Sequence, residues 1–267
     1  MKRVLLFLVA VALIGAPSWG RVLPPGAFFL SGKVVLREPL IVPEGTTLYV
    51  APGTRVSVEI PGNGEEIQAI VVAGKIVVDG RPTAPVVVTG RRGWGEIYLD
   101  GAVAVVENMV VENPFWGFHV HESTALFRRV VVRGGKGGIR SNGTGIYVYD
   151  SEFLGCDIAL RYLNGGPVVR RSRISGVRVG IFFREGVSTA LFRENEIGAT
   201  EYLVRVGDFA SGYLDVRGNY WGTADPRIIG KMIFDGREKP LTVDHFFPLL
   251  TSSPLKRGAS LLTDGHR

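Results

Sequence analysis

Short runs of alternating apolar and polar residues follow one another along most of the chain, and Gly, Pro or Asn separates them. Typical runs are VVENMVV, LFRRVVV and GIYVYDSEF. None of them shows the 3.6-residue period of an amphipathic helix, and alternation with period two is typical of half-buried strands. The pattern therefore predicts an all-β chain made of many short strands.

The runs repeat at a nearly constant interval. One set of equivalent positions is spaced by 21, 22, 21, 23 and 23 residues: Val110, Val131, Phe153, Ile174, Ile197 and Tyr220. A fixed period of this size indicates a solenoid, in which each repeat stacks on the next. Three strands of about 3–6 residues with brief corners fill one such period. We therefore predict a single-stranded right-handed parallel β-helix with about 21–23 residues per coil.

Polar residues near these positions suggest how the coils are held together. Three residues before each register position the charge alternates in sign: Glu107, Arg128, Asp150, Arg171, Glu194 and Arg217. One residue before, Glu152, Arg173 and Glu196 repeat the alternation. Stacked coils lie about 4.8 Å apart, so these lines predict ion pairs between coils. Two residues before lies a polar ladder interrupted by one arginine: Asn108, Arg129, Ser151, Ser172, Asn195 and Gly218.

Side-chain alternation also assigns orientations. It predicts that Asn108 and Val110 point to one side of their strand and that Glu107 and Met109 point to the other.

A second strand of each coil offers a candidate binding face. The segments GFHVH (117–121), GIRSN (138–142), DIALR (157–161) and GIFFR (180–184) align with Phe118, Ile139, Ile158 and Ile181 toward the core. Two lines then face outward: His119, Arg140, Ala159 and Phe182, and beside them His121, Asn142, Arg161 and Arg184. Guanidinium groups at coil spacing suit carboxylates or sulfates on a linear polymer. Phe182, with Phe115 and Trp116 in the adjoining turn, would stack on sugar rings.

Catalytic and metal-binding chemistry have weaker candidates. Asp150 and Glu152 are same-face neighbours near the carboxylate separation of an inverting glycosidase, but arginines flank them, which disfavours a general acid. Asp208 and Asp215 form a second, weaker pair. His119 and His121 supply two imidazoles, whereas zinc normally takes three or four ligands. Their aligned neighbours are Arg140 and Asn142, so we expect no metal and no cofactor.

The N-terminus resembles a secretory signal peptide. Lys2 and Arg3 precede an apolar run from 4 to 16, and cleavage after Ser18 or Gly20 satisfies the small-residue rule. This run is shorter than the roughly 20 residues that span a bilayer, so we expect an exported protein without stable membrane insertion. Cys156 is the only cysteine, which rules out an internal disulfide, and its apolar context predicts a buried thiol.

The net charge of +6 is unevenly distributed. Residues 126–193 contain twelve Lys or Arg against four acidic residues. Such an excess on a rigid rod attracts polyanions, and export argues against nucleic acid as the partner.

Two longer strings resemble a known family. LIVPEGTTLYVAPGTRVSV, IVVAGKIVVDGRPTAPVVVTG and WGEI are similar to the opening coils of exported bacterial and archaeal β-helix proteins. NYWGTADPRIIGKMIFDGREKPLTVDHFFPLL (219–250) resembles the closing segment of the same group. The group shares the pectate-lyase-like fold with polysaccharide lyases, polygalacturonase-like hydrolases and the carbohydrate-binding repeats of the periplasmic copper-maturation protein of nitrous oxide reductase. The resemblance implies an extracytoplasmic β-helix with a carbohydrate partner, and it implies no particular reaction.

These observations divide the chain and leave three functions open. We expect a signal peptide (1–20), a lead-in (21–31), the β-helix (32–222), a C-terminal cap (223–250) and a mobile tail (251–267). In the cap, Pro226 and RIIGKMIF predict a short helix or turn, and LTVDHFFPLL predicts a last apolar strand. The favoured function is non-catalytic binding of an anionic polysaccharide. The alternatives are a polysaccharide lyase or glycosidase and a purely structural envelope protein.

Overall fold

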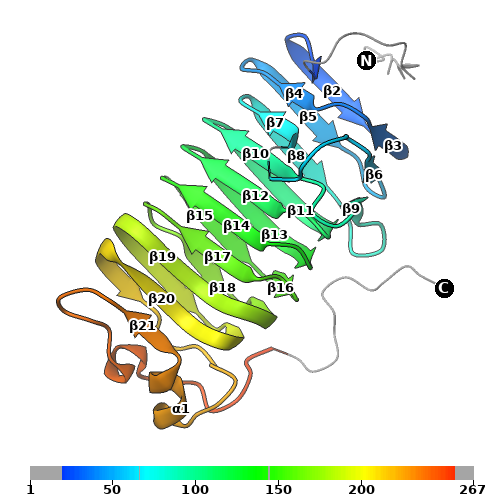
Figure 1. The fold of residues 1–267 in the computed structure, drawn as a ribbon. Coiled ribbons are helices and arrows are strands. Elements are labelled where there is room, and N and C mark those ends of the chain that lie inside the picture. Colours follow the sequence, from blue (N-terminus) through cyan, green and yellow to red (C-terminus); the bar gives the residue numbers. More distant parts are fainter. Residues whose placement is uncertain (1–19, 66, 144, 256–267) are drawn as a thin grey trace, which may run out of the picture.

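The protein is a parallel β-solenoid of about nine turns (Figure 1), seen in a computed structural model that describes residues 20–65, 67–143 and 145–255. The predicted all-β parallel β-helix is confirmed. Each turn of the chain visits three faces in a fixed order, and every strand pairs in parallel with its equivalent in the next coil. We call the three faces A, B and C. The predicted signal peptide lies almost wholly outside the described residues, as do residues 256–267 of the predicted tail.

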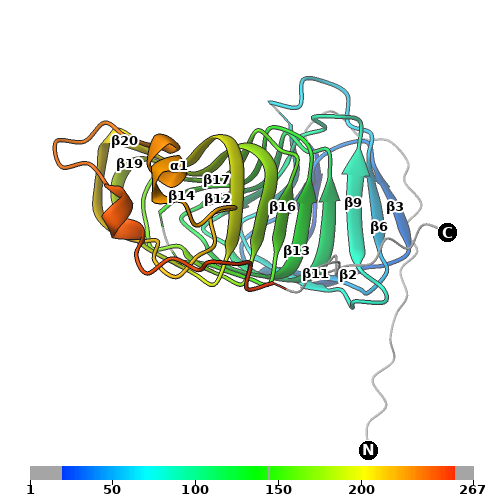
Figure 2. The same ribbon diagram turned by 90° about the horizontal axis from the view of Figure 1, so that it is seen from below.

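The strands divide among the faces as follows. Face A contains β1 (Arg21–Val22), β4 (Leu40–Val42), β7 (Gln68–Val72), β10 (Glu96–Asp100), β12 (Trp116–His121), β14 (Gly137–Asn142), β17 (Ile158–Tyr162), the middle of β19 (Arg173–Arg193) and β20 (Glu196–Asp215), and β21 (Ile233–Asp235). Face B contains β2 (Gly26–Leu30), β5 (Thr46–Val50), β8 (Lys75–Asp79), the first parts of β11 (Val103–Glu112) and β13 (Thr124–Arg133), β15 (Ile146–Tyr149), β18 (Val168–Arg170) and the ends of β19 and β20. Face C contains β3 (Lys33–Leu36), β6 (Arg55–Val58), β9 (Val86–Gly90), the second parts of β11 and β13, β16 (Glu152–Leu154) and the starts of β19 and β20. Figure 2 shows strands of face C side by side.

The interior of the solenoid is filled by aliphatic and aromatic side chains. Val42, Val72, Phe127 and Phe153 are fully buried, and one continuous core runs through the coils. An internal cavity of about 20 Å³ lies among aliphatic side chains near the N-terminal end. Cys156 is also buried, as expected, and burial raises the pKa of its thiol to about 12.

One corner in six successive coils is formed by a residue with left-handed backbone geometry. These residues are stacked in a line, with φ from 49° to 67°: Asn108, Arg129, Asp150, Arg171, Glu194 and Gly218. Five of the six are not glycine, although this region is costly for residues with a Cβ atom. Because such a corner interrupts the alternation of the flanking strands, it determines which side chains after it enter the core.

Backbone pairing corrects the predicted register by one residue between Val131 and Phe153. Val110 pairs with Val131, and Val131 pairs with Glu152 rather than with Phe153. Val110 and Val131 lie in an outer cluster on face C, whereas Phe153, Ile174 and Ile197 are in the core. Tyr220 pairs with Glu196. A shift of one residue along a strand exchanges its inner and outer faces. The predicted line therefore joined residues of an outer line with residues of a core line.

The predicted orientations beside this corner were also wrong. Met109 is in the core, whereas Glu107 faces outward and pairs with Arg128. The left-handed corner at Asn108 lies between them, and strict alternation does not continue through it.

The predicted polar ladder exists in shifted form. Four buried side chains accept hydrogen bonds from backbone N–H groups of the preceding coil. The pairs are Val130 N to Ser151 Oγ (3.1 Å), Ser151 N to Ser172 Oγ (3.1 Å), Ser172 N to Asn195 Oδ1 (2.9 Å) and Asn195 N to Asn219 Oδ1 (3.0 Å). Ser151, Ser172 and Asn195 are confirmed as members. Asn108, Arg129 and Gly218 belong to the left-handed corner line instead, and Asn219 takes the place expected for Gly218.

The predicted ion pairs between coils form, but not as one continuous line. Arg128 contacts Glu107 (3.1 Å), Arg171 contacts Asp150 (2.7 Å), and Arg173 lies between Glu152 (3.6 Å) and Glu196 (3.4 Å). Arg128 pairs in register with Tyr149 rather than with Asp150. The charged residues therefore occupy three lines: one immediately before the left-handed corner, one at the corner itself and one two residues after it.

The two ends of the solenoid differ. The segment expected to be a lead-in, 21–31, itself carries β1 and β2 of the first coil. At the other end α1 (Pro226–Lys231) begins at Pro226, as expected, and β21 adds a further strand to face A. Residues 241–250 do not form the predicted strand. They contain a 3₁₀ helix, η1 (Val243–Phe246), which places Phe246 against Trp221.

No helix within the described residues has both the length and the apolar character needed to cross a bilayer.

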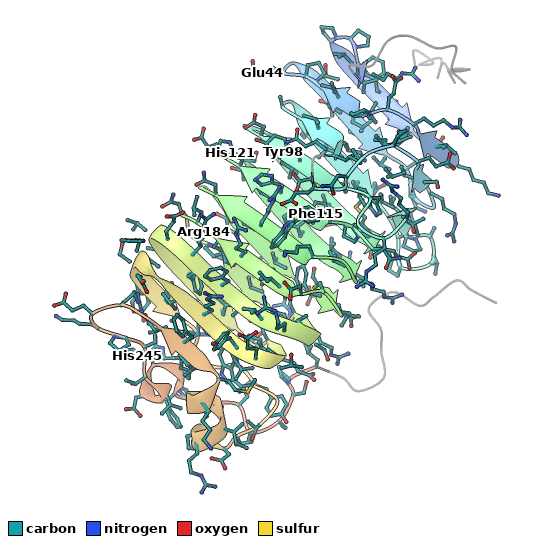
Figure 3. All side chains as sticks on the ribbon, in the orientation of Figure 1. Glu44, Tyr98, Phe115, His121, Arg184 and His245 are labelled. Carbon is teal, nitrogen blue, oxygen red and sulfur yellow. The ribbon has the colours of Figure 1, made fainter. Side chains whose placement is uncertain are left out.

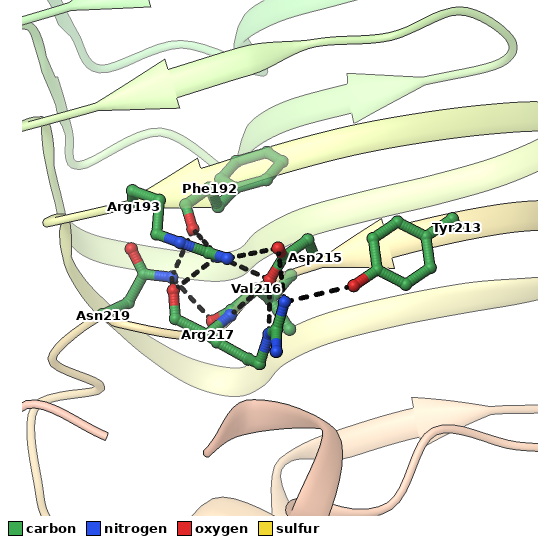
Figure 4. Close-up of polar contacts among 7 residues, drawn as sticks. All are labelled: Phe192, Arg193, Tyr213, Asp215, Val216, Arg217 and Asn219. Carbon is green, nitrogen blue, oxygen red and sulfur yellow. Dashed lines mark hydrogen bonds and ion pairs between the residues drawn. The ribbon is translucent and has the colours of Figure 1, made fainter. Parts of the chain in front are cut away.

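The last coil also holds a buried carboxylate between two arginines (Figure 4). Arg217 Nε donates to Asp215 Oδ1 (3.0 Å), Arg193 contacts both carboxylate oxygens, and Tyr213 Oη accepts from Arg217 (3.2 Å). The hydrogen bonds from Arg217, followed by those from Arg193, hold the pKa of Asp215 well below its ordinary value despite burial. Both arginines are therefore committed to this cluster, which leaves Asp215 a poor catalytic acid.

This cluster predicts an acid-dependent contribution to stability. A carboxylate with a lowered pKa stabilises the fold above its unfolded-state pKa, about 3.9, and the contribution is lost as the pH falls further. The Asp215→Asn variant should therefore have a lower melting temperature than the parent at pH 7. The difference should shrink steadily as the pH is lowered below about 4. Melting curves of both proteins over that range test this, and a difference independent of pH would contradict it.

Candidate functional site

A single outward line of side chains runs along face A from end to end. Backbone pairing connects its members in register: Val22, Ile41, Val71, Tyr98, His119, Arg140, Arg161, Phe182, Arg205 and Phe234. We call this the central line of face A. Figure 3 shows the side chains of the protein and labels Tyr98, and also His121 and Arg184 of the neighbouring positions. Neighbouring members are separated by one coil, about 4.8 Å.

The structure confirms the outward alignment of His119, Arg140 and Phe182 and corrects one coil. Arg161, not Ala159, pairs with Arg140 and Phe182. Ala159 is fully buried, and Ile158 lies in an outer cluster with Trp116 and Val179 rather than in the core. The cause is a column of small residues, in which Ala159 occupies the place that Gly138 has one coil earlier. DIALR therefore starts two residues too early in the predicted alignment.

The N-terminal half of the line is organised by a buried carboxylate. Glu96 is 2 % exposed and begins β10. It accepts two hydrogen bonds from Arg140 Nη2 (2.9 and 2.7 Å), and its Oε1 lies 3.0 Å from His119 Nδ1. Tyr98 packs against the His119 ring with 4.7 Å between centroids. His119 and Arg140 are thus fixed in place by Glu96, which the sequence alignment did not include.

Trp116 forms the floor beneath the two arginines. It is 1 % exposed, and the guanidinium groups of Arg140 and Arg161 each lie 5.7 Å from the centre of its ring. Trp116 is the first residue of β12 rather than part of a turn, and the arginines cover its face. It therefore orients cations and is not available to stack on a ligand ring. Phe115, beside it, is partly exposed.

Arg161 differs from its neighbours in its electrostatic surroundings. It is half-buried, and among the described residues it makes no ion pair with a carboxylate. Burial, together with the nearby cations Arg184 and Arg140, lowers the pKa of its guanidinium. The Glu185 carboxylate acts in the opposite direction, but it is the weakest of these influences on the pKa and forms no ion pair with Arg161. Removing a charge from water without a bound counter-charge is costly. Arg161 is thus a cation held on an aromatic floor beside a second arginine.

The C-terminal half of the line is a group of aromatic rings around another arginine. The Arg205 guanidinium lies 4.9 Å from the Phe182 ring centre, 5.5 Å from Phe234 and 6.0 Å from Tyr202. Its Nε is buried without a hydrogen-bond partner in the described part of the protein. Phe234, from β21, is 40 % exposed and extends this platform to the end of face A.

The second predicted line, at the edge of face A, is polar and mostly paired. His121 Nδ1 lies 2.9 Å from Asp100 Oδ1, and Asn142 Oδ1 accepts from Asn164 Nδ2 (3.2 Å). His121 and Asn142 are aligned, as predicted. Arg184 is exposed, with Glu185 at 3.4 Å. Arg161 does not belong to this line, because it lies on the central one.

The catalytic candidates are engaged in the ion pairs between coils. Asp150 occupies a left-handed corner and pairs with Arg171, and Glu152 is 2 % exposed and pairs with Arg173. Asp208 is exposed, and Asp215 is held by two arginines. Across residues 20–65, 67–143 and 145–255, no group of three or more His, Cys, Asp or Glu side chains is arranged to hold a metal ion.

Four residues of the site were missed when the repeat segments of this chain were aligned with one another: Glu96, Tyr98, Arg205 and Phe234. Tyr98 and Arg205 occupy the same position within EIYLD and LVRVG that His119 occupies within GFHVH. Extending the alignment by one coil in each direction would have found these two. Phe234 follows the cap helix α1 and has no repeat signal.

The chain was also compared with known proteins. No protein-family model, no curated protein and no solved structure matches it.

Proposed function

We propose that the protein is an exported, non-catalytic binding protein for an anionic polysaccharide, which lies along the central line of face A. The observation that carries the proposal is Arg161, a half-buried guanidinium without a carboxylate partner among the described residues. A carboxylate or sulfate group on a ligand would supply the missing counter-charge. Arg presents a planar fork of donors that suits both groups.

The neighbours of Arg161 support a polymer rather than a small anion. The charge–aromatic line continues over Phe182, Arg205 and Phe234 at one residue per coil. Phe182 and the exposed Phe234 would offer apolar surfaces to sugar rings, and Arg184 adds charge beside them. A linear chain lying along the solenoid axis would meet the same chemistry again every 4.8 Å or so.

Two further parts of the proposal rest on the sequence. The basic and apolar N-terminus favours export, with a periplasmic, cell-surface or secreted destination. The opening string LIVPEGTTLYVAPGTRVSV and the closing NYWG segment resemble exported pectate-lyase-like β-helix proteins, some of which act on or bind polysaccharides. Binding is favoured over lyase or glycosidase activity because the carboxylates Asp150, Glu152 and Asp215 are each paired with arginine.

Affinity measurements with the Arg161→Ala variant test the proposal. Calorimetry or a glycan array would compare uronate and sulfated polymers with a neutral glucan. The parent should bind an anionic polymer, and Arg161→Ala should bind it about 10–100-fold more weakly, because charge-assisted hydrogen bonds contribute about 1.5–3 kcal/mol. Arg55→Ala, an exposed arginine on face C, is the matched control and should bind like the parent.

Two results would contradict this proposal. One is a parent protein that binds none of the anionic polymers, and the other is equal binding by the parent and Arg161→Ala. The same incubations, assayed for new reducing ends and for unsaturated products, distinguish a binding protein from a glycosidase or lyase. We expect neither product.

A further inference from the structure

Face B carries an outward apolar line that runs over eight coils and ends at Leu191, which pairs with Asp215 in the next coil. Backbone pairing connects eight outward residues in consecutive coils, and none of them is charged: Phe29, Tyr49, Val77, Val105, Leu126, Tyr147, Val168 and Leu191. All eight are at least partly exposed. Phe29 is 74 % and Tyr147 39 % exposed. We call this set the face B stripe.

Faces A and C do not carry an uncharged outward line like the face B stripe. The equivalent central line of face A contains three arginines and a histidine, and the outer line of face C contains Glu152, Arg173 and Glu196. Exposed Val103 (48 %) and Tyr213 (61 %) widen the apolar surface on face B. A continuous apolar surface of this length on a soluble protein marks an interaction site.

A charged line beside the stripe changes sign along the solenoid. Toward the N-terminal end it presents Asp79 and Glu107, and in the next coil Arg128. Toward the C-terminal end it presents Arg170 and Arg193 after Tyr149. The line therefore begins with two acidic residues, and from Arg128 onward its charged members are basic.

We propose that the stripe is a self-association surface, on which a second copy of this chain packs face to face and antiparallel. A twofold axis parallel to the strands relates the two copies. It makes their coils run in opposite directions and places the charged line of one copy opposite the charged line of the other. Setting Glu107 against Arg170 then sets Arg128 against Tyr149. It also places Asp79 opposite Arg193, whose guanidinium already binds Asp215 of its own chain. Leu126 of one copy meets Tyr147 of the other at the centre. The two stripes thus match in apolarity, and Glu107 opposite Arg170 provides the complementary charges.

The contact has the size of a weak dimer. Six coils at about 4.8 Å and strands about 17 Å long give about 490 Å² per copy, or close to 1,000 Å² in total. Stable interfaces bury about 1,200–2,000 Å², and weak, transient ones bury less. Aligned sheet packing, as in β-sandwiches, provides the geometry. The expected association is therefore concentration-dependent, with a dissociation constant in the micromolar range.

Sedimentation equilibrium of the purified chain, from about 1 to about 200 µM, tests the association. The parent should shift from monomer to dimer mass across this range. Leu126→Lys, at the centre of the stripe, should weaken association at least ten-fold. Val35→Lys makes a similar change on the outer surface of face C and should associate like the parent. Circular dichroism melting establishes that each variant is folded.

Cysteine cross-linking tests the antiparallel arrangement and does not depend on the lysine variant. Glu107→Cys and Arg170→Cys chains, mixed in equal amounts and oxidised, should form the mixed disulfide in clear excess over the two homodimers. Cys156 is buried and should not take part. A statistical mixture of disulfides would overturn the proposal. So would a parent that stays monomeric at every concentration because its own chain covers the stripe, or one that grows into long head-to-tail assemblies.

Discussion

Replacing Trp221 by alanine is expected to destabilise the protein by about 3–5 kcal/mol, the cost typical of removing a buried Trp or Phe. Trp221 is 2 % exposed and packs edge-on against Phe246, with 4.8 Å between ring centroids. Both rings cover the core at the last coil, with Ile229 of α1 fully buried beside them. Without the indole, the end of a stack of coils opens to water. Urea unfolding followed by far-UV circular dichroism measures the effect.

Two further variants show whether this loss comes from the cap. Phe247→Ala changes an aromatic residue of the same segment that is 44 % exposed, and it should cost less than about 0.5 kcal/mol. Trp221→Phe keeps most of the ring and should lose less than alanine does. If Trp221→Ala is as mild as Phe247→Ala, the cap does not close the solenoid in the way described here.

Asn219→Ala is expected to cost about 2–4 kcal/mol, because it leaves several buried backbone groups without partners. Asn219 is fully buried. Its Oδ1 accepts from the backbone N (3.0 Å) and Nδ2 (2.9 Å) of Asn195, and its Nδ2 donates to the carbonyls of Phe192 (3.1 Å) and Val216 (2.7 Å). One amide thus connects the last two coils and the corner between them. The free energy of unfolding of the variant tests this directly.

Ser151→Ala is the matched control for this prediction. It belongs to the same ladder, but its hydroxyl accepts a single N–H, from Val130 (3.1 Å), and donates to the carbonyl of Tyr149 (2.8 Å). We expect a loss of about 1 kcal/mol. Equal losses in Ser151→Ala and Asn219→Ala would show that the number of hydrogen bonds does not determine the contribution of a ladder position.

The period of the sequence was enough to predict the architecture, but not the register. A repeat of 21–23 residues with alternating apolar positions leaves few folds other than a stacked one. The left-handed corners were not predictable in the same way. Asn and Asp favour this conformation, but Arg129, Arg171 and Glu194 occupy it as well, and nothing in a single sequence identifies them. The corner recurs at the same place in each of these coils, so the one-residue register error has another cause. Val110 and Val131 stand within the apolar runs MVV and VVV, in which the sequence does not show which valine faces the core.

The candidate site was found in part for the same reason. His119, Arg140 and Phe182 were aligned correctly because a small residue and a buried apolar residue precede each of them at constant spacing. Arg161 was displaced because Ala159 stands where neighbouring coils have glycine. Glu96 was missed because its role depends on contacts from two later coils, His119 at 3.0 Å and Arg140 at 2.7 Å. Contacts between side chains of different coils depend on how the coils stack, and the residue pattern within one coil does not predict them.

The filled interior has a consequence for selectivity. The internal cavity of about 20 Å³ has no room for a metabolite, which usually needs a pocket of some 300–1,000 Å³. A molecule lying on an outer face instead gains contacts one coil at a time. Discrimination would then be based on the length and charge spacing of the bound molecule, so that short oligomers dissociate quickly and long chains remain.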